Sequence, residues 1–252
     1  MRSVSVLCAR GPNVGAGCHD EAMTGVVTRR WTDAGKTWFA VGGISAEQLG
    51  STAHLLMGYE RHGDEWRIEH PADTPRLDQC WRTFSASAEL MVRQAAGMAP
   101  VPWRDALREL CRRTAEAGVS WWLTGSAAIA VRGAPLRPGD LDLVCSVEDA
   151  IRLCDVFADE LVEPVLPSGA DWISEYWGRA FYGARIEWIG GPRPTVDTPV
   201  PTDFGPAAAA RLEAATWEDW TIRVPPLDLQ RAVSLRRSLT DRVALIDSLL
   251  AH

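Results

Sequence analysis

Residues 123–143 read LTGSAAIAVRGAPLRPGDLDL, and this stretch decides the fold of the second half of the chain. The apolar run that ends at Thr124 predicts a buried strand, Gly125-Ser126 predicts a turn, and 127–131 predict a short helix. A loop rich in glycine and proline follows, and residues 140–145 predict a second strand. A strand, a turn, a short helix and a second strand in this order bring the two strands side by side in one sheet.

The second of these strands carries the triplet Asp140-Leu141-Asp142. Because side chains alternate along a strand, both carboxylates face the same side of the sheet, about 6.5 to 7 Å apart. Two like charges this close are unfavourable unless a cation lies between them. Mg²⁺ prefers oxygen ligands and is commonly held by one or two carboxylates together with substrate phosphates. The triplet is therefore a candidate magnesium site.

Gly125 and Ser126 form the turn between the first strand and the short helix. Backbone N–H groups at such a turn can hold phosphate, and a glycine leaves room for close approach. The phosphate site and the carboxylates would then face one cleft. A purely structural interpretation also stands, in which Gly125-Ser126 is an ordinary turn and the two aspartates belong to an exposed strand face.

Composition limits the chemistry. The chain has 252 residues, a net charge of -7 and 26 basic residues, of which Lys36 is the only lysine. His252 is the only histidine after residue 70, so a site beyond that point must use carboxylates, hydroxyls, thiols or a metal. The six cysteines show no C-x-x-C spacing and no apolar run is long enough to span a membrane, which predicts free thiols and a cytoplasmic protein.

The remaining sequence predicts an α+β fold, a small mixed β-sheet flanked by helices, preceded by an additional α/β region. We expect a loose arm over 1–22, an N-terminal α/β region of unknown role over 23–100 and a larger domain over 104–252. The segment 97–103 contains two prolines and marks the boundary. Further expected elements are a hairpin over 26–42, helices over 45–57, 77–95, 147–161 and 207–215, strands over 182–189 and 221–224, and one or two helices ending at Leu250.

The motif LTGSAAIAVR, a loop and RPGDLDL resemble the nucleotidyltransferase fold of the DNA polymerase β superfamily, in its small bacterial branch. The resemblance covers roughly residues 104–250. The C-terminal segment 224–247 is similar to the helices that follow the catalytic sheet in aminoglycoside and lincosamide nucleotidyltransferases and in abortive-infection toxins.

This resemblance implies a site. Asp140 and Asp142 would bind one or two Mg²⁺ ions, and Glu187, as the third carboxylate, would be a metal ligand or a general base. Gly125 and Ser126 would hold the β and γ phosphates. Many family members place a lysine near the triphosphate, a position for which this chain offers arginines, which can clamp phosphate in bidentate fashion. The implied candidates for phosphate contact are Arg137, Arg231 and Arg236.

The implied reaction transfers a nucleoside monophosphate from a nucleoside triphosphate such as ATP to a hydroxyl of a small, antibiotic-like molecule. Two alternatives stay open. A toxin-type transferase would modify RNA, and a non-catalytic binding or antitoxin module would keep the fold without turnover. We expect Glu187 to lie near the two aspartates if the chain is an enzyme. No membrane partner is expected, and the oligomeric state is not predicted.

Overall fold

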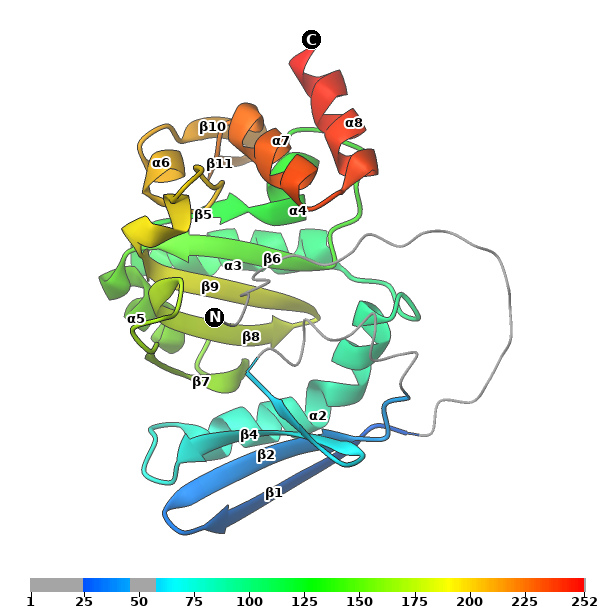
Figure 1. The fold of residues 1–252 in the computed structure, drawn as a ribbon, viewed down its shortest axis with the longest axis vertical. Coiled ribbons are helices and arrows are strands. Elements are labelled where there is room, and N and C mark those ends of the chain that lie inside the picture. The colour runs from blue at the N-terminus through cyan, green and yellow to red at the C-terminus, as the bar shows by residue number, and fades with distance from the viewer. Residues whose placement is uncertain (1–24, 46–57, 252) are drawn as a thin grey trace. The chain divides into compact units, whose positions relative to one another are not determined.

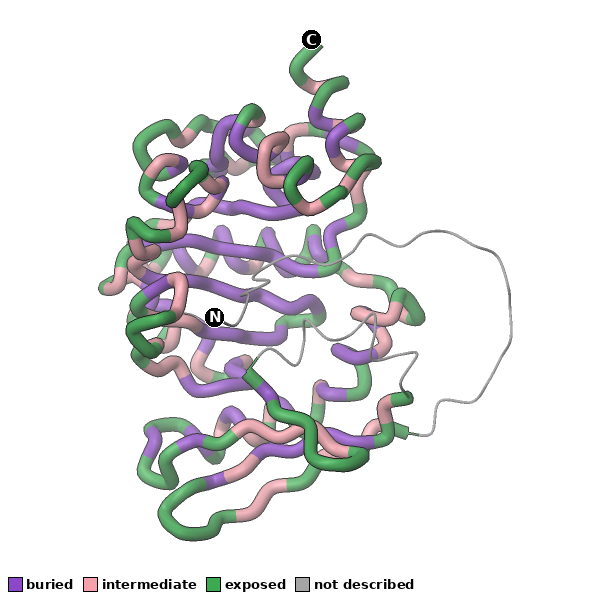
Figure 2. The backbone as a smooth tube through the Cα atoms, in the orientation of Figure 1, coloured by how far each residue is buried: buried purple, intermediate pink, exposed green. Residues whose placement is uncertain are grey.

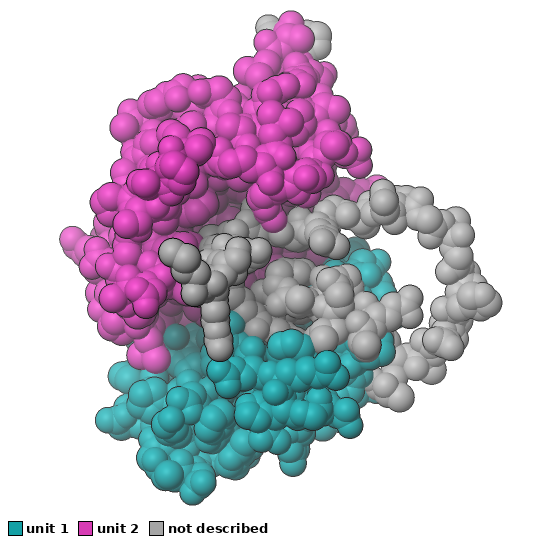
Figure 3. Space-filling model, in the orientation of Figure 1, with its two compact units in different colours: residues 1–100, 162–164 teal, residues 101–161, 165–252 magenta. Residues whose placement is uncertain are grey.

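The computed structural model describes residues 25–45 and 58–251. The expected arm over 1–22 and most of the expected helix over 45–57 lie outside the described residues. The chain divides into two compact units, residues 1–100 with 162–164 and residues 101–161 with 165–252 (Figure 3). No helix in the described part of the chain is long and apolar enough to cross a membrane.

The first unit contains an antiparallel four-stranded sheet in the order β1-β2-β4-β3 and one long helix. The expected hairpin forms because Ala34 and Gly35, both with positive φ, close the turn between its two strands. Phe39 is fully buried and stacks on Phe84 of the helix, with ring centroids 6.1 Å apart. The elements are β1 (Val27–Asp33), β2 (Lys36–Gly42), β3 (Glu60–His62), β4 (Glu65–Pro71) and α2 (Leu77–Ala95).

The second unit is built on a five-stranded sheet in the order β5-β6-β9-β8-β7, of which only residues 162–164 of the edge strand β7 are grouped with the first unit (Figure 1). Strand β6 is antiparallel to β5 and parallel to β9, and β9 is antiparallel to β8, so the sheet is mixed. Figure 2 shows that β6 and β9 are buried along most of their length. The strands are β5 (Trp121–Thr124), β6 (Asp140–Cys145), β7 (Leu161–Pro167), β8 (Ser174–Tyr182) and β9 (Ala184–Pro192).

Helices and a small hairpin surround this sheet. Helices α3 and α5 contact the central strands β6 and β9, respectively, and β11 of the small hairpin contacts β5. Ile246 of α8 packs against Ile129 of α4 in a small apolar cluster. The elements are α3 (Trp103–Ala117), α4 (Gly125–Ala130), α5 (Val147–Val156), the 3₁₀ helix η2 (Pro194–Asp197), α6 (Pro206–Ala209), β10 (Glu213–Trp217), β11 (Trp220–Val224), α7 (Leu227–Arg236) and α8 (Thr240–Leu250).

The α+β class with a mixed sheet flanked by helices is confirmed. Two expected helices are wrong in part. The helix expected over 147–161 ends at Val156, and β7 begins at Leu161. The helix expected over 207–215 is only the short α6, because residues 213–217 pair with β11 as a strand.

Candidate active site

Three carboxylates meet in the middle of the five-stranded sheet. The parallel register of β6 and β9 sets Asp142 opposite Glu187, and alternation along β6 places Asp140 on the same face. One oxygen from each carboxylate lies within 4.8 Å of the other two. All three residues are buried, at 3 to 4% exposure. The structure therefore brings Glu187 to the two aspartates, as expected for an enzyme.

The turn at Gly125 lies against this triad. Thr124, the last residue of β5, is opposite Asp142, and Gly125 begins α4 with φ +64°. A Cβ at Gly125 would overlap Oδ2 of Asp142 and lie 3.3 Å from its Cγ. Both the backbone conformation and the close approach therefore require glycine. Ser126 follows in the same helix and is 8% exposed.

Two buried arginines hold two of the carboxylates. Arg185 of β9 donates to Oδ2 of Asp140, and its Nε lies 3.1 Å from Oε1 of Glu187. Arg179 of β8, which is opposite Glu187 in the β8–β9 pairing, donates from Nε to the same Oε1 over 2.6 Å. The guanidinium of Arg179 also lies over the Trp177 ring, 4.6 Å from its centroid. Both arginine side chains are at most 4% exposed.

Asp142 differs from its two neighbours. No other described residue forms an ion pair with it. Burial raises the pKa of Asp142 well above its usual range, and the charges of Asp140 and Glu187 raise it further. Arg185 and Arg242 of α8 oppose this rise in pKa. In these surroundings the negative charge of Asp142 is unfavourable, and a bound cation would offset that cost.

A fourth buried carboxylate lies beside the turn. Asp203 is 6% exposed, and its backbone oxygen accepts a hydrogen bond from Oγ1 of Thr124 over 3.1 Å. Burial raises the pKa of Asp203 to about 6, although the Thr124 hydroxyl and the charges of Arg242 and Arg237 act in the opposite direction. The charge of Arg242 therefore lowers the pKa of both Asp142 and Asp203.

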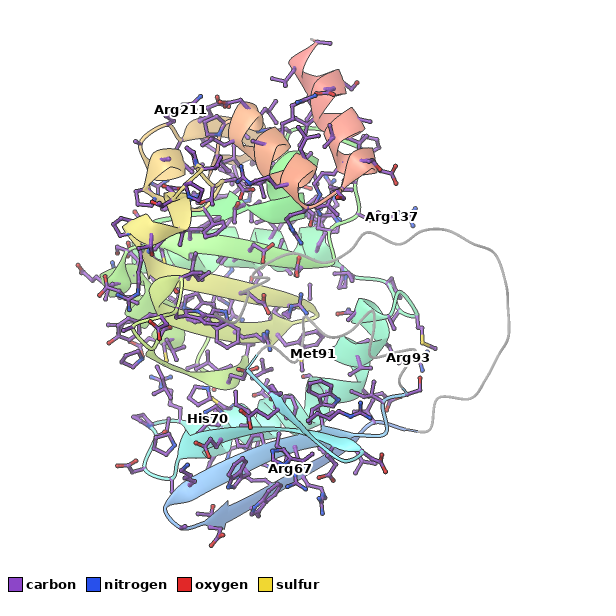
Figure 4. All side chains as sticks on the ribbon, in the orientation of Figure 1. Arg67, His70, Met91, Arg93, Arg137 and Arg211 are labelled. Carbon is purple, nitrogen blue, oxygen red and sulfur yellow. The ribbon has the colours of Figure 1, made fainter. Side chains whose placement is uncertain are left out.

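The three arginines expected to contact phosphate belong to the second unit, and the structure gives two of them other partners. Arg137, labelled in Figure 4, is exposed on the loop between α4 and β6. Arg231 pairs with Asp247, its Nη2 lying 3.2 Å from Oδ2, and Arg236 donates to the backbone oxygen of Pro201 over 2.8 Å. None of the three forms a hydrogen bond or ion pair with the triad.

Sequence reasoning missed Arg179, Arg185, Asp203 and Arg242. One signal was available, since Arg185 stands two residues before Glu187 on one strand and must share its face. Arg179 needs the β8–β9 register, and Asp203 and Arg242 come from a loop and a helix whose approach no local pattern encodes.

The donor set suits a hard divalent cation. Three carboxylates offer only oxygen ligands, which Mg²⁺ prefers, and they are gathered in one buried cluster. A bound cation would also offset the unfavourable negative charge of Asp142. The residues present therefore fit magnesium.

No family model matches this sequence, and no curated protein matches it either. One solved structure that resembles this chain is a candidate nucleotidyltransferase from Thermotoga maritima, determined at 1.87 Å resolution. The two chains are 21% identical, and the match covers 59% of this chain and 92% of the other with a TM-score of 0.44.

Proposed function

We propose that this protein is a Mg²⁺-dependent nucleotidyltransferase. It transfers a nucleoside monophosphate from a nucleoside triphosphate such as ATP to a hydroxyl of a small, antibiotic-like molecule. The observation that carries the proposal is the buried triad Asp140, Asp142 and Glu187, which three strand positions gather beside the Gly125 turn. Buried carboxylates without a matching number of cations are costly, and a function that uses a metal explains why they persist.

Asp140, Asp142 and Glu187 would hold the cation. When bound, Mg²⁺ supplies positive charge that offsets the phosphate oxygens as the reaction proceeds. Gly125 and Ser126, at the turn beside Asp142, would hold the triphosphate through their backbone N–H groups. Arg137, Arg231 and Arg236 remain proposed phosphate contacts, and Arg242 joins them because its charge acts on Asp142.

The protein's own residues account for the proton as well. The acceptor oxygen forms a bond to the α-phosphorus, the bond to the β-phosphate oxygen breaks, and pyrophosphate leaves. Glu187 either completes the metal ligands or takes the proton of the acceptor hydroxyl. Arg179 and Arg185 keep its carboxylate in place on the face shared with the aspartates.

The direct test is nucleotide transfer by the purified protein. We would incubate it with Mg²⁺, each labelled nucleoside triphosphate and a panel of aminoglycosides, lincosamides and tRNA. Labelling of a small molecule supports the proposal, labelling of tRNA assigns the acceptor to RNA, and absence of transfer to any acceptor favours the non-catalytic module.

Replacement of Asp142 by asparagine tests the triad. Asp142→Asn removes a buried charge that a cation needs, so we expect transfer to fall below detection while circular dichroism shows a folded protein. Asp228→Asn is the matched control, because Asp228 pairs with Arg211 on the surface of the same unit. Full activity in Asp142→Asn would show that the triad does not take part in the reaction.

A further inference from the structure

The triad and its two arginines carry less negative charge than the carboxylates suggest. The two guanidinium groups place positive charge against carboxylates that are buried with them, since the five residues are all at most 4% exposed. Charges this deeply buried are weakly screened by water and salt. Each guanidinium therefore strongly weakens the attraction of the carboxylates for a divalent cation.

Arg185 and Arg179 differ in position. Arg185 bridges two of the candidate ligands, Asp140 and Glu187. Because it lies two residues before Glu187 on β9, its side chain is on the same face of the sheet as the ligands. Arg179 contacts Glu187 from the neighbouring strand and is held over the Trp177 ring. Arg185 is therefore the arginine that bridges Asp140 and Glu187.

We propose that Arg185 tunes the triad to bind a divalent cation together with a nucleoside triphosphate rather than a cation alone. This inference rests on the proposed function. Arg185 engages carboxylate oxygens that a cation would use, and its charge repels a free cation. The same charge reduces the repulsion between the carboxylates and a triphosphate, so it favours the metal–nucleotide complex. Arg185 is a positioning residue that acts through Asp140 and Glu187.

The test is cation affinity, which loss of structure alone would not increase. Mn²⁺ reports binding by electron paramagnetic resonance. We expect Arg185→Gln to bind Mn²⁺ alone at least tenfold more tightly than the unmodified protein. We also expect it to bind a fluorescent ATP analogue, at saturating Mn²⁺, at least fivefold more weakly. Unchanged or weaker Mn²⁺ binding by folded Arg185→Gln would overturn the inference.

Arg113 provides the matched control. It also bridges two carboxylates, those of Glu109 and Glu160, but on α3 outside the triad. We expect Arg113→Gln to bind Mn²⁺ and the nucleotide as the unmodified protein does. An equal gain in Mn²⁺ affinity in Arg113→Gln would also overturn the inference, since the effect would then be a general one.

A second variant covers the case in which Arg185→Gln is not recovered folded. Arg185→Lys keeps the charge but loses the planar fork that spans Asp140 and Glu187. We expect at least threefold tighter Mn²⁺ binding, and no gain overturns the inference. Transfer by the unmodified protein without any gain in the variants upholds the proposed function and removes this role from Arg185. A gain in a protein that transfers no nucleotide upholds the role in cation binding and overturns the proposed function.

Discussion

At the residue scale, Gly125 and the carboxylate of Asp142 lie so close that no Cβ fits between them. Gly125 has a left-handed φ of +64°, and the space that its Cβ would fill is taken by the carboxylate of Asp142. A side chain here would push the carboxylate away from Glu187 or lift the turn off the strand. The glycine therefore allows both the left-handed turn and the position of the Asp142 carboxylate.

Gly125→Ala tests this contact. We expect it to lower the free energy of unfolding by about 1–3 kcal/mol, because it adds both backbone strain and overlap. Transfer should fall at least tenfold, measured with the assay for Asp142→Asn. Gly139→Ala is the matched control, since Gly139 immediately precedes Asp140, has no positive φ and has nothing near its Cβ position. Equal effects of the two substitutions would contradict the role given to Gly125.

At the scale of elements, Ser146 caps the N-terminus of helix α5, which directly follows strand β6. Ser146 follows the last residue of β6, and its Oγ accepts a hydrogen bond from the backbone N–H of Asp149 over 3.0 Å. Helix α5 then packs on β9, which carries Glu187. The cap helps to hold the helix that supports the third carboxylate.

Removal of this cap should affect stability and leave the chemistry intact. We expect Ser146→Ala to lower the free energy of unfolding by about 1 kcal/mol, measured by urea unfolding. Ser146→Asn, whose side-chain oxygen can still accept the hydrogen bond and which adds no charge beside Asp149, should lose less than half as much. Transfer should stay within twofold in both variants. A loss as large for asparagine as for alanine would show that the hydroxyl contributes something other than the cap.

Local patterns predicted the elements that local physics controls. Helix α2 has the expected bounds, and the β1–β2 hairpin forms where a glycine turn joins two β-rich runs. Strand β7 was missed because it contains Pro164 and ends at Pro167, which a strand tolerates at the edge of a sheet. The alanines before Trp217 favoured a helix because alanine has a high helix propensity. Pairing with β11 outweighs this propensity, which contributes little free energy per residue.

In the candidate site, too, the sequence predicted the residues whose positions follow from a local pattern. Alternation alone places Asp140 and Asp142 on one face, and their proximity to Glu187 is confirmed by the structure. Arg179 and Arg185, which pair with Glu187 and Asp140, were not predicted. Strand β8 places Arg179 through a cross-strand register. Contacts of this kind depend on which strands become neighbours, and a single sequence does not encode that order locally.

At the scale of the whole molecule, two buried groups, one in each unit, have pKa values shifted in opposite directions. In the first unit, burial lowers the pKa of His70, labelled in Figure 4, from 6.5 to about 4, and its ring lies edge-on to Phe39. In the second unit, burial raises the pKa of Asp203 from 3.8 to about 6. The two groups should respond to acid in opposite directions.

The signs follow from which state binds the proton. Between pH 6.5 and about 4 the unfolded chain protonates His70 and the folded chain does not, so acid destabilises the first unit. Between pH 6 and 3.8 the folded chain protonates Asp203 and the unfolded chain does not, so acid relieves the cost of the buried charge in the second unit.

Urea unfolding at pH 7 and pH 5 tests both signs. From pH 7 to pH 5 we expect His70 to remove about 2 kcal/mol of stability and Asp203 to add about 1 kcal/mol. His70→Phe should therefore resist acid better than the unmodified protein, and Asp203→Asn should be more stable than it at pH 7 but gain less on acidification. His62→Phe is the control for the first unit, because His62 is an exposed histidine on β3. Parallel pH dependence in all four proteins would mean that neither buried group controls the acid response.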